Sequence, residues 1–323
     1  MEIAVIGSGA WGSSLALIAN RAGNKVTIFS NNQYICEEIN HYHTNQNYLP
    51  NINLPEDIKA TSNIKDIVNN DLLMLVTPAQ TIRKICENLA IAGLPKDKII
   101  LICSKGIERN SLKLMSEIVE EILPKTQVAI LSGPNFALPI AENKPAITSI
   151  AAKDIELAKY LSERLSNINF RIYPNDDIIG TQIVGAAKNV LAIALGMCIG
   201  KNLGENANAA IFSRGINEIA NLIKAKNGNV ETLLSPAGIG DLYLTCGSNT
   251  SRNTSFGIEF ASKNHIDTEK KLIEGFYTAE SIVFLAKSLN VEMPIANSVY
   301  AIIHQNLPLD KAIESLLNRH VIF

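Results

Sequence analysis

The sequence predicts an α/β protein of two domains, with a doubly wound sheet over residues 1–175 and a mainly α-helical domain over residues 176–323. Three observations predict this fold class. Short apolar runs alternate with helix-like periods in the first half of the chain. A glycine-rich turn, GSGAWG, joins the first apolar run to the first helical stretch. Beyond Pro174 strand patterns disappear, and apolar residues recur at three- and four-residue steps.

Charge and composition exclude several classes of protein. Lys and Arg number 29 against 31 Asp and Glu, so a net charge of −2 provides no broad basic surface for nucleic acid. Hydrophobic residues make up 47% and charged residues 19%, which is typical of a globular chain. The five cysteines form no CxxC pair, so we expect no disulfide framework, no metal site and a cytoplasmic location. No signal peptide is expected either.

The first predicted element is a strand, residues 1–6, that passes through GSGAWG into a helix. Gly7 permits a sharp turn, Gly9 lets a pyrophosphate approach the backbone, and Gly12 lets the helix pack closely on the strand. The helix N-terminus would face the phosphates. We therefore predict a Rossmann-type dinucleotide site at this turn.

The second predicted strand, residues 25–29, ends in Ser30-Asn31-Asn32, where a Rossmann protein places the residue that binds the adenosine ribose. No Asp or Glu stands there to bind two ribose hydroxyls, and no Arg stands there to hold a 2′-phosphate. At this point the sequence leaves both NAD and NADP open.

Three later turns follow apolar runs that are typical of parallel strands buried on both faces, residues 71–76, 98–103 and 128–131. Loops after the carboxyl ends of such strands line the ligand crevice of a doubly wound sheet. The second of these turns carries Lys105, which is therefore a cation at the crevice. Strand-like runs at residues 145–151 and 170–173, with an amphipathic helix at residues 155–165, complete the sheet domain.

The helical domain begins with a long apolar helix over residues 176–200, which Asn175 or Asp176 would cap. Its glycines and polar residues favour a buried helix over a membrane span. Lys188 lies at its centre, where burial would lower the pKa of the ammonium and let it exchange a proton near neutral pH. The alternative is a lysine that reaches the rim or pairs with a buried carboxylate.

Further helical periods cover residues 207–226, 278–289 and 295–304. Between them, residues 235–253 are rich in turn formers and polar groups. Asp241 in this stretch could bind a hydroxyl or orient Lys188. Ser251-Arg252-Asn253 has the pattern of a helix start with a hydroxyl and a guanidinium, which suits a phosphate, although a capped helix with a surface arginine gives the same pattern.

With these motifs in order, nearly the whole chain resembles the bacterial-type NAD(P)-dependent glycerol-3-phosphate dehydrogenases. The motifs are GSGAWG at 7–12, SKGIE at 104–108, SGPNFA at 132–137, GAAKN at 185–189, AGIGDL at 237–242, SRN at 251–253 and IEG at 273–275. The resemblance implies reversible hydride transfer between NAD or NADP and dihydroxyacetone phosphate, giving sn-glycerol 3-phosphate for phospholipid synthesis.

The resemblance also implies roles for particular residues. Lys188 would be the general acid and base, Lys105 would contact substrate and nicotinamide, and Asp241 would contact substrate beside Lys188. The implied substrate-binding residues are Lys105, Gly133, Asn135, Lys188, Asp241, Ser251, Arg252 and Asn253. The implied cofactor-binding residues are Gly7, Gly9, Ala10, Trp11, Gly12, Asn31, Lys105, Ala137, Arg252, Leu272 and Glu274.

Three positions depart from the family pattern. Ala187 stands where a larger aliphatic residue usually precedes the lysine, Asn135 stands where Ser or Thr is common, and Asn31 stands where Arg or His is frequent. The neutral Asn31, in place of Arg or His, weakens the case for NADP.

Two alternatives remain. A hydroxy-acid dehydrogenase of the same fold would recognise a carboxylate, and a catalytically idle nucleotide-binding regulator need not keep Lys105, Lys188 and Asp241 together. In each case the ligand is a small molecule and no membrane span is expected, while a homodimer is left open.

Overall fold

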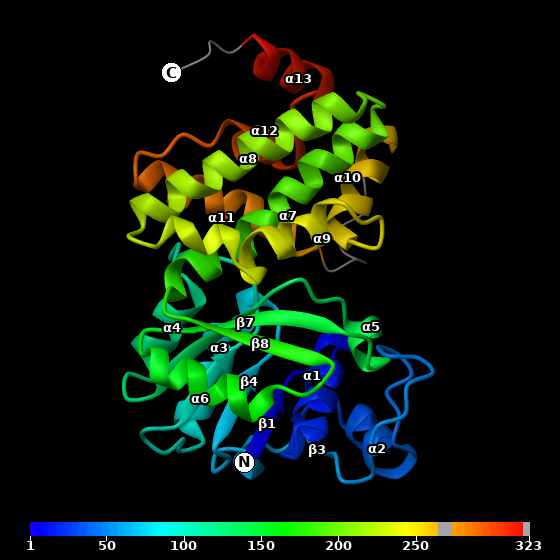
Figure 1. Cartoon of the computed structure of the whole chain (residues 1–323), viewed down its shortest axis with the longest axis vertical. Helices are drawn as coiled ribbons and strands as arrows, with labels where there is room; N and C mark the ends of the chain where they lie inside the picture. Colours follow the sequence, from blue (N-terminus) through cyan, green and yellow to red (C-terminus); the bar gives the residue numbers. More distant parts are fainter. Residues whose placement is uncertain (264–272, 319–323) are drawn as a thin grey trace.

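The computed structural model describes residues 1–263 and 273–318, which form two domains stacked one above the other (Figure 1). The lower domain in Figure 1 is built on a sheet, and the regular elements of the upper domain are all helices over the part of the chain that the structure describes. The loops at the carboxyl ends of the central strands face the helical domain. This junction is the crevice in which the sequence places its candidate site.

Among the described residues, one eight-stranded sheet has the order β3-β2-β1-β4-β5-β6-β7-β8. The strands are β1 (Glu2–Ile6), β2 (Lys25–Phe29), β3 (Lys59–Thr61), β4 (Leu72–Leu75), β5 (Ile99–Ile102), β6 (Gln127–Ser132), β7 (Ala146–Ala152) and β8 (Phe170–Asn175). All neighbours are parallel except β6 and β7, which pair antiparallel. The strand order reverses between β1 and β4, which is where a doubly wound sheet binds ligands.

Helices cover both faces of this sheet, and the period of two along each strand divides the apolar side chains between them. In β1, Ile3 and Val5 join the core on one face, whereas Ala4 and Ile6 join the core on the other. The first face packs against α1 (Ala10–Arg21), α2 (Gln33–Tyr42), α5 (Ala137–Ala141) and α6 (Ile155–Leu165), and the second against α3 (Ile82–Ile91) and α4 (Met115–Ile122). Burial on both faces explains why the central strands are continuous apolar runs.

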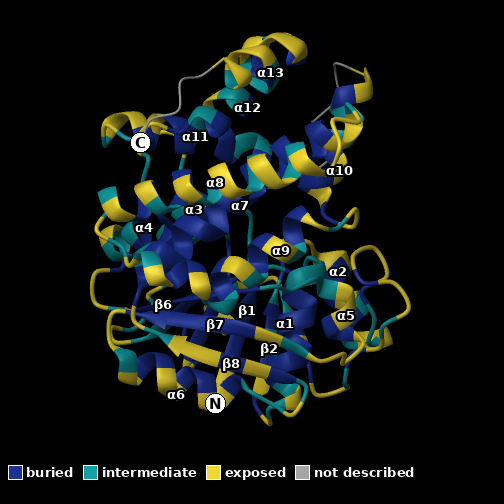
Figure 2. Cartoon of the chain, turned by 45° about the horizontal axis from the view of Figure 1, so that its top comes forward, coloured by how far each residue is buried: buried dark blue, intermediate teal, exposed yellow. Residues whose placement is uncertain are grey.

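The helical domain is organised around α7 (Ile178–Gly200), which rises from the junction into its core (Figures 1 and 2). The other helices are α8 (Glu205–Ala225), α9 (Asp241–Cys246), α10 (Arg252–Lys263), α11 (Glu274–Ser288), α12 (Pro294–Gln305) and α13 (Leu309–Leu317). In length and hydropathy α7 would suit a membrane span, but 89% of its apolar 18-residue stretch is buried inside the protein. It is therefore a core helix, as the sequence predicted.

The predicted cap of α7 is wrong by one residue, because Asp177 caps the helix instead of Asn175 or Asp176. Asp177 Oδ1 accepts a hydrogen bond from the Gly180 N–H at 2.9 Å, while Oδ2 accepts from Asn229 N at 3.0 Å and Thr232 Oγ1 at 2.6 Å. A carboxylate with two oxygens can satisfy both the helix end and the neighbouring loop. Asn175 instead accepts from the Asp177 N–H.

Two glycines let α7 and α10 cross in backbone contact. A Cβ on Gly196 would lie 2.2 Å from the Thr254 carbonyl oxygen, and a Cβ on Gly257 would lie 2.3 Å from the Ile193 carbonyl oxygen. Because α7 carries Lys188 and α10 begins at Arg252, this contact fixes one site helix against the other.

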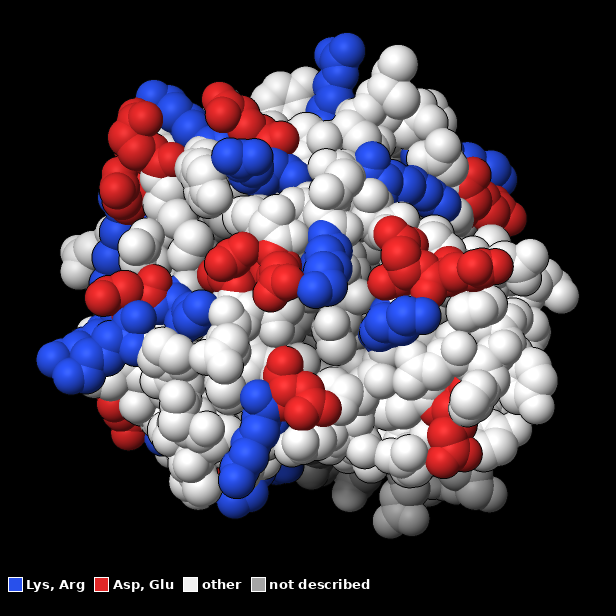
Figure 3. Space-filling view, turned by 90° about the horizontal axis from the view of Figure 1, so that it is seen from below, with Lys and Arg blue, Asp and Glu red and all other residues white. Residues whose placement is uncertain are grey.

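The surface carries charges of both signs. On the face seen from below, Lys and Arg side chains are interspersed with Asp and Glu side chains (Figure 3). The five cysteines are all free and buried.

Candidate active site

Lys188 lies on a buried turn of α7 with only 7% of its surface exposed. Its Nζ donates to Asp241 Oδ1 at 2.5 Å and to Thr245 Oγ1 at 3.0 Å. Burial lowers the pKa of Lys188 to about 8, the carboxylate of Asp241 opposes this shift, and the positive charge of Lys105 adds to it. The ammonium can therefore lose and regain a proton close to neutral pH.

Asp241 stands between two lysines. It is 1% exposed, and its Oδ2 accepts from Lys105 Nζ at 2.6 Å while Oδ1 accepts from Lys188. Burial alone would raise the pKa of Asp241, but the two ammonium groups outweigh burial and hold the pKa below its usual value. The carboxylate is thus ionised and orients both cations.

A kinked turn delivers Asp241 to this position. Residues 236–240 form a single π-helical turn in which Gly238 has the non-helical angles φ −90° and ψ −106°. A Cβ on Gly238 would lie 2.3 Å from two carbonyl oxygens, those of Thr232 and Leu233, so glycine is required there. Helix α9 begins directly afterwards at Asp241.

Lys105 reaches the cluster from the loop after β5. Besides Asp241, its Nζ donates to the Gly133 carbonyl oxygen at 3.3 Å. Its side chain is 20% exposed, so it is the more open of the two lysines. Its stem passes beside α7, because a Cβ on Gly185 would lie in van der Waals contact with Lys105 Cγ, at 3.5 Å.

Thr245 belongs to the cluster but was not predicted. It lies four residues after Asp241, hence on the same face of α9, and its hydroxyl also donates to Asp241 Oδ1 at 3.4 Å. That spacing of four was the signal in the sequence that could have revealed it.

The turn after β6 lies beside Lys105. A Cβ on Gly133 would lie 2.6 Å from Thr148 Oγ1, so only glycine lets this turn pack on β7. Asn135 Nδ2 donates to the Ile147 and Pro134 carbonyl oxygens, each at 2.9 Å. Its Oδ1 has no hydrogen-bond partner among the described residues.

Residues 251–253 lie at the start of α10, with Ser251 directly before the helix, as the motif suggested. Ser251 is buried, and its Oγ accepts from the Thr254 N–H at 3.4 Å. Arg252 is exposed on the first turn of the helix.

Asn253 is buried and joins three helices. Its Nδ2 donates to Asn189 Oδ1 on α7 at 3.0 Å, and its Oδ1 accepts from the Gly275 N–H on α11 at 3.0 Å. Asn253 therefore ties α10 and α11 to the residue next to Lys188.

Glu274, the first residue of α11, connects this region to the sheet domain. Its carboxylate accepts a hydrogen bond from the Ala79 N–H, in the turn after β4. Burial raises the pKa of Glu274 to about 7, against the opposing effects of that hydrogen bond and of the Arg252 charge. Leu272, also expected to bind cofactor, lies outside the described residues.

The glycine turn fits a dinucleotide. Gly7 has φ +125°, and a Cβ on Gly12 would lie 1.8 Å from the Gly7 carbonyl oxygen, so both positions require glycine. A Cβ on Gly9 would meet nothing within 4 Å, which leaves open space before the N-terminus of α1. An anion can approach the backbone there.

Other expected cofactor contacts surround this space. Ala10 and Trp11 form the first turn of α1, and Ser14 Oγ donates to the carbonyl oxygens of Ala10 at 2.9 Å and Ala137 at 2.8 Å. Ala137, at the start of α5, therefore lies beside α1. Asn31 is exposed at the end of β2.

Asn45 was not predicted, yet it supports the glycine turn. It is 1% exposed, and its Nδ2 donates to the Ser8 carbonyl oxygen at 2.7 Å and to Ser13 Oγ at 2.9 Å. It follows α2 along the chain, so the sequence alone gave no sign that it lies under residues 8–13.

Comparisons with known proteins agree over nearly the whole chain. Residues 2–158 match the family "NAD-dependent glycerol-3-phosphate dehydrogenase N-terminus", and residues 177–314 match its C-terminus. The glycerol-3-phosphate dehydrogenase (NAD(P)+) of Ehrlichia ruminantium (strain Welgevonden) is 43% identical, over 98% of this chain and 100% of that protein. The protein of the same name from Bradyrhizobium diazoefficiens is 41% identical, over 98% and 97%. The glycerol-3-phosphate dehydrogenase of Coxiella burnetii, known from a crystal structure, is 35% identical in sequence. Its fold matches with a TM-score of 0.92 over 98% of this chain and 99% of that one.

Proposed function

Because the chain belongs to the NAD-dependent glycerol-3-phosphate dehydrogenase family, we propose that the cluster of Lys188, Asp241 and Lys105 is its catalytic centre. The protein is an oxidoreductase that reduces dihydroxyacetone phosphate to sn-glycerol 3-phosphate with NAD(P)H and catalyses the reverse oxidation with NAD(P)+. This reaction serves phospholipid synthesis. The observation that carries the assignment of the centre is a buried carboxylate held within 2.6 Å of two lysines at the domain junction.

When held at the glycine turn and beside Lys105, the nicotinamide cofactor would supply the hydride for C2 of the substrate, or accept it in the reverse direction. Lys188 acts as the general acid during reduction, because its proton can pass from Nζ to the oxygen on C2. In the reverse direction neutral Lys188 accepts that proton. General acid and base catalysis of this kind contributes a factor of about 10² to 10⁴.

Asp241 and Lys105 support this proton transfer in different ways. Asp241 fixes the direction of both lysine side chains, since each of its oxygens accepts from one of them. Lys105 keeps a positive charge beside the oxygen on which negative charge develops, which stabilises the transition state. Its partial exposure also lets it face substrate and nicotinamide together.

We assign phosphate and hydroxyl recognition to the surrounding turns. Arg252 has an exposed guanidinium on the first turn of α10, where the positive end of the helix dipole adds to its charge. Ser251, Asn253, Gly133 and Asn135 complete the proposed substrate site. Asn135 Oδ1 is an unsatisfied buried acceptor, which supports a role in binding a substrate hydroxyl.

The proposed cofactor site follows the glycine turn. Open space at Gly9, in front of the N-terminus of α1, supports the placing of the pyrophosphate there. The remaining proposed contacts are Gly7, Ala10, Trp11, Gly12, Asn31, Lys105, Ala137, Arg252, Leu272 and Glu274.

The two alternatives drawn from the sequence are not favoured. The chain belongs to a family whose members act on glycerol 3-phosphate, which argues against a hydroxy acid as substrate. An idle regulator has no need to hold Lys105, Lys188 and Asp241 in one contact cluster.

Three further features belong to this proposal. Residues 1–175 form the cofactor domain and residues 176–323 the substrate domain. Five unpaired cysteines support a cytoplasmic location. The protein assembles as a homodimer, which is supported by exposed apolar side chains at the edge strand β8: Ile168, just before the strand, is 91% exposed, and Tyr173, on the strand, is 47% exposed. Light scattering on the purified protein tests the dimer.

The direct test of function is the loss of NADH absorbance after addition of dihydroxyacetone phosphate, with 2-oxo acids as a parallel substrate panel. Turnover of dihydroxyacetone phosphate alone supports the proposal, and turnover of the acids alone would overturn it.

A further inference from the structure

The loop that carries Lys105, residues 104–114, is held by both domains. Ser104 Oγ donates to the Thr77 carbonyl oxygen at 2.5 Å, and Gln80 Nε2 donates to the Ile107 carbonyl oxygen at 2.8 Å. Ile107 and Leu114 are fully buried, bridge each other, and belong to the core of the helical domain. These contacts hold the loop in one conformation. The position of its backbone therefore determines where the Lys105 side chain begins.

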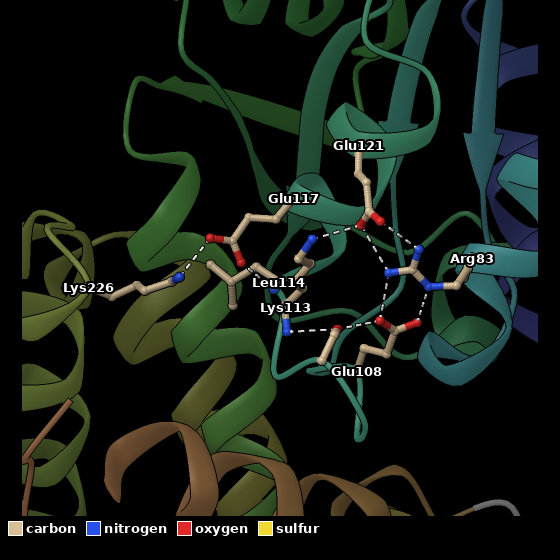
Figure 4. A network of polar contacts seen from close by, with 8 residues as sticks. Arg83, Glu108, Lys113, Leu114, Glu117, Glu121 and Lys226 are labelled. Carbon is tan, nitrogen blue, oxygen red and sulfur yellow. Dashed lines mark hydrogen bonds and ion pairs between the residues drawn. The ribbon is translucent and has the colours of Figure 1, made fainter. Parts of the chain in front are cut away.

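Glu108 is the ionic anchor of this loop (Figure 4). Arg83 on α3 donates Nε to Oε1 at 2.9 Å and Nη2 to Oε2 at 2.9 Å, which is a bidentate fork. Ser111 Oγ donates to the same carboxylate. The Glu108 side chain is only 12% exposed, so the fork is partly desolvated.

Arg83 has a second carboxylate partner that does not belong to the loop. Its Nη1 and Nη2 donate to Glu121 on α4 at 3.2 and 3.1 Å, and Lys113 Nζ also donates to Glu121 at 2.8 Å (Figure 4). One guanidinium thus holds the Lys105 loop on one side and a helix of the sheet domain on the other.

We propose that Arg83 and Glu108 are positioning residues of the reaction: their fork fixes the 104–114 loop so that the Lys105 ammonium is held against Asp241 and the Gly133 carbonyl. The inference rests on the proposed function, since it takes Lys105 to act on the substrate. Glu108 lies three residues after Lys105, and among the described residues no hydrogen bond or ion pair joins Glu108 or Arg83 to Lys188 or Asp241. A displacement of about 1 Å in a catalytic group costs about 10²-fold in rate, so loosening of the loop is expected to be visible in turnover.

The chain offers a matched pair of variants. Glu108→Gln and Glu121→Gln each remove one carboxylate from Arg83. Glu108 lies on the Lys105 loop itself, whereas Glu121 lies on α4 and contacts the loop only through an exposed ion pair with Lys113, at the end of the loop away from Lys105. Glu108→Gln is expected to lower kcat/KM for dihydroxyacetone phosphate by about tenfold or more, mainly through kcat, with the Kd for NADH unchanged. Glu121→Gln is expected to stay within about twofold of the wild type, because surface pairs of this kind contribute little.

The pH profile gives a readout that a purely structural role would not change. The charged groups around Lys188 are Asp241 on α9 and Lys105 on the loop, with the Cys246 thiol nearby. The charge of Lys105 lowers the pKa of Lys188. If the loop loosens, Lys105 lowers the pKa of Lys188 less than before. The alkaline limb of the pH profile for reduction is therefore expected to move to higher pH in Glu108→Gln and to stay in place in Glu121→Gln.

Lys105→Met distinguishes a failure of the proposed function from a failure of the positioning role alone. If the wild type does not turn over dihydroxyacetone phosphate, or if Lys105→Met keeps the wild-type rate, the proposed function fails. If Lys105→Met is inactive while Glu108→Gln and Glu121→Gln share the same kcat and the same position of the alkaline limb, the positioning role alone is overturned. Should Glu108→Gln not fold, Arg83→Lys replaces it, since lysine keeps the charge and loses the fork. A wild-type kcat and pH limb in Arg83→Lys would likewise overturn the positioning role.

Discussion

Lys188 can change its charge without leaving Asp241 unpaired, and this follows from the second lysine. When Lys188 is protonated, the three groups carry one net positive charge. When it has given up its proton, Lys105 and Asp241 remain as an ion pair at 2.6 Å. A buried carboxylate that lost its only partner would cost several kcal/mol, about 3 to 5 in measured cases. The second lysine therefore makes both protonation states of a general acid tolerable.

The pH dependence of the two directions of reaction is expected to be opposite. Reduction needs protonated Lys188, so its rate falls as pH rises through about 8, while oxidation needs neutral Lys188 and its rate rises over the same range. Initial rates at saturating substrates, measured in both directions, check this. Asp241→Asn serves as the control: it removes the anion that raises the pKa of Lys188, so both limbs are expected to move to lower pH. Parallel profiles in the two directions would contradict the assignment.

At the scale of elements, the packing of α7 against α10 sets the relation between the general acid and the proposed phosphate anchor. Gly196 and Gly257 bring the two backbones together without side chains between them. Ordinary helix pairs keep their axes 8 to 10 Å apart, with distance set by the side chains at the contact. A site divided between two helices needs such a fixed contact, because Lys188 and Arg252 belong to different helices.

Gly196→Ala is expected to destabilise the protein, although alanine favours helix by about 1 kcal/mol. The new Cβ would lie 2.2 Å from the Thr254 carbonyl oxygen, so α10 must shift, and overpacking of this kind costs about 1 to 3 kcal/mol. The KM for dihydroxyacetone phosphate should rise as well, because Arg252 moves with α10. Urea denaturation and steady-state kinetics measure both effects. Gly200→Ala, at the last residue of α7, would also press on α10, with its Cβ 2.8 Å from the Ile258 carbonyl oxygen. This contact lies farther along α10 from Arg252, so the rise in KM should be smaller, and an equal rise in KM would argue against the mechanism.

Arg252→Ala is expected to weaken substrate capture. A charge-assisted contact to phosphate contributes about 2 to 4 kcal/mol, so kcat/KM should fall roughly 30- to 1000-fold. A loss confined to KM would mean that Arg252 binds ground state and transition state alike, and a loss in kcat as well would mean that it also positions the carbonyl. Stability should hardly change, because the side chain is exposed. Wild-type kinetics would leave Arg252 as a surface residue of a capped helix.

At the scale of the whole molecule, local patterns predicted the sheet well and the long-range contacts poorly. The predicted strand over residues 25–29 and helix over residues 155–165 match β2 and α6 at both ends. Helix α2 was not predicted, because only Ile35, Cys36 and Ile39 of its residues are buried, which leaves few apolar positions to mark a helix.

Contacts between distant residues could not be read from the sequence. Lys105 and Asp241 are 136 residues apart, and their pairing depends on how the two domains stack. Asn253 was expected to bind substrate, but nothing local showed that its amide joins α7, α10 and α11. The cap of α7 was misplaced for a similar reason, because Asp177 is favoured by partners in the distant 229–232 loop.

The enzyme is expected to use NADH at least as well as NADPH. At the end of β2, Ser30 Oγ is engaged by Ser8 and by the Asn32 N–H, and the Asn32 side chain caps α2, so Asn31 presents a neutral amide to the ribose. No guanidinium at that strand end would repay the desolvation of a 2′-phosphate. Comparison of kcat/KM for the two cofactors tests this. A preference for NADPH above about tenfold, roughly 1.4 kcal/mol, would contradict it.

The most direct test of the catalytic assignment is kcat for Lys188→Ala, measured on one preparation together with Tm and NADH affinity. Alanine suits the helix, the apolar neighbours of Lys188 still hold α7, and Asp241 keeps Lys105 as its partner. The fold and NADH binding should therefore persist while kcat falls by about 10² to 10⁴. A folded mutant with near wild-type kcat, or a mutant that loses stability while its folded fraction still turns over, would show that Lys188 is a structural lysine.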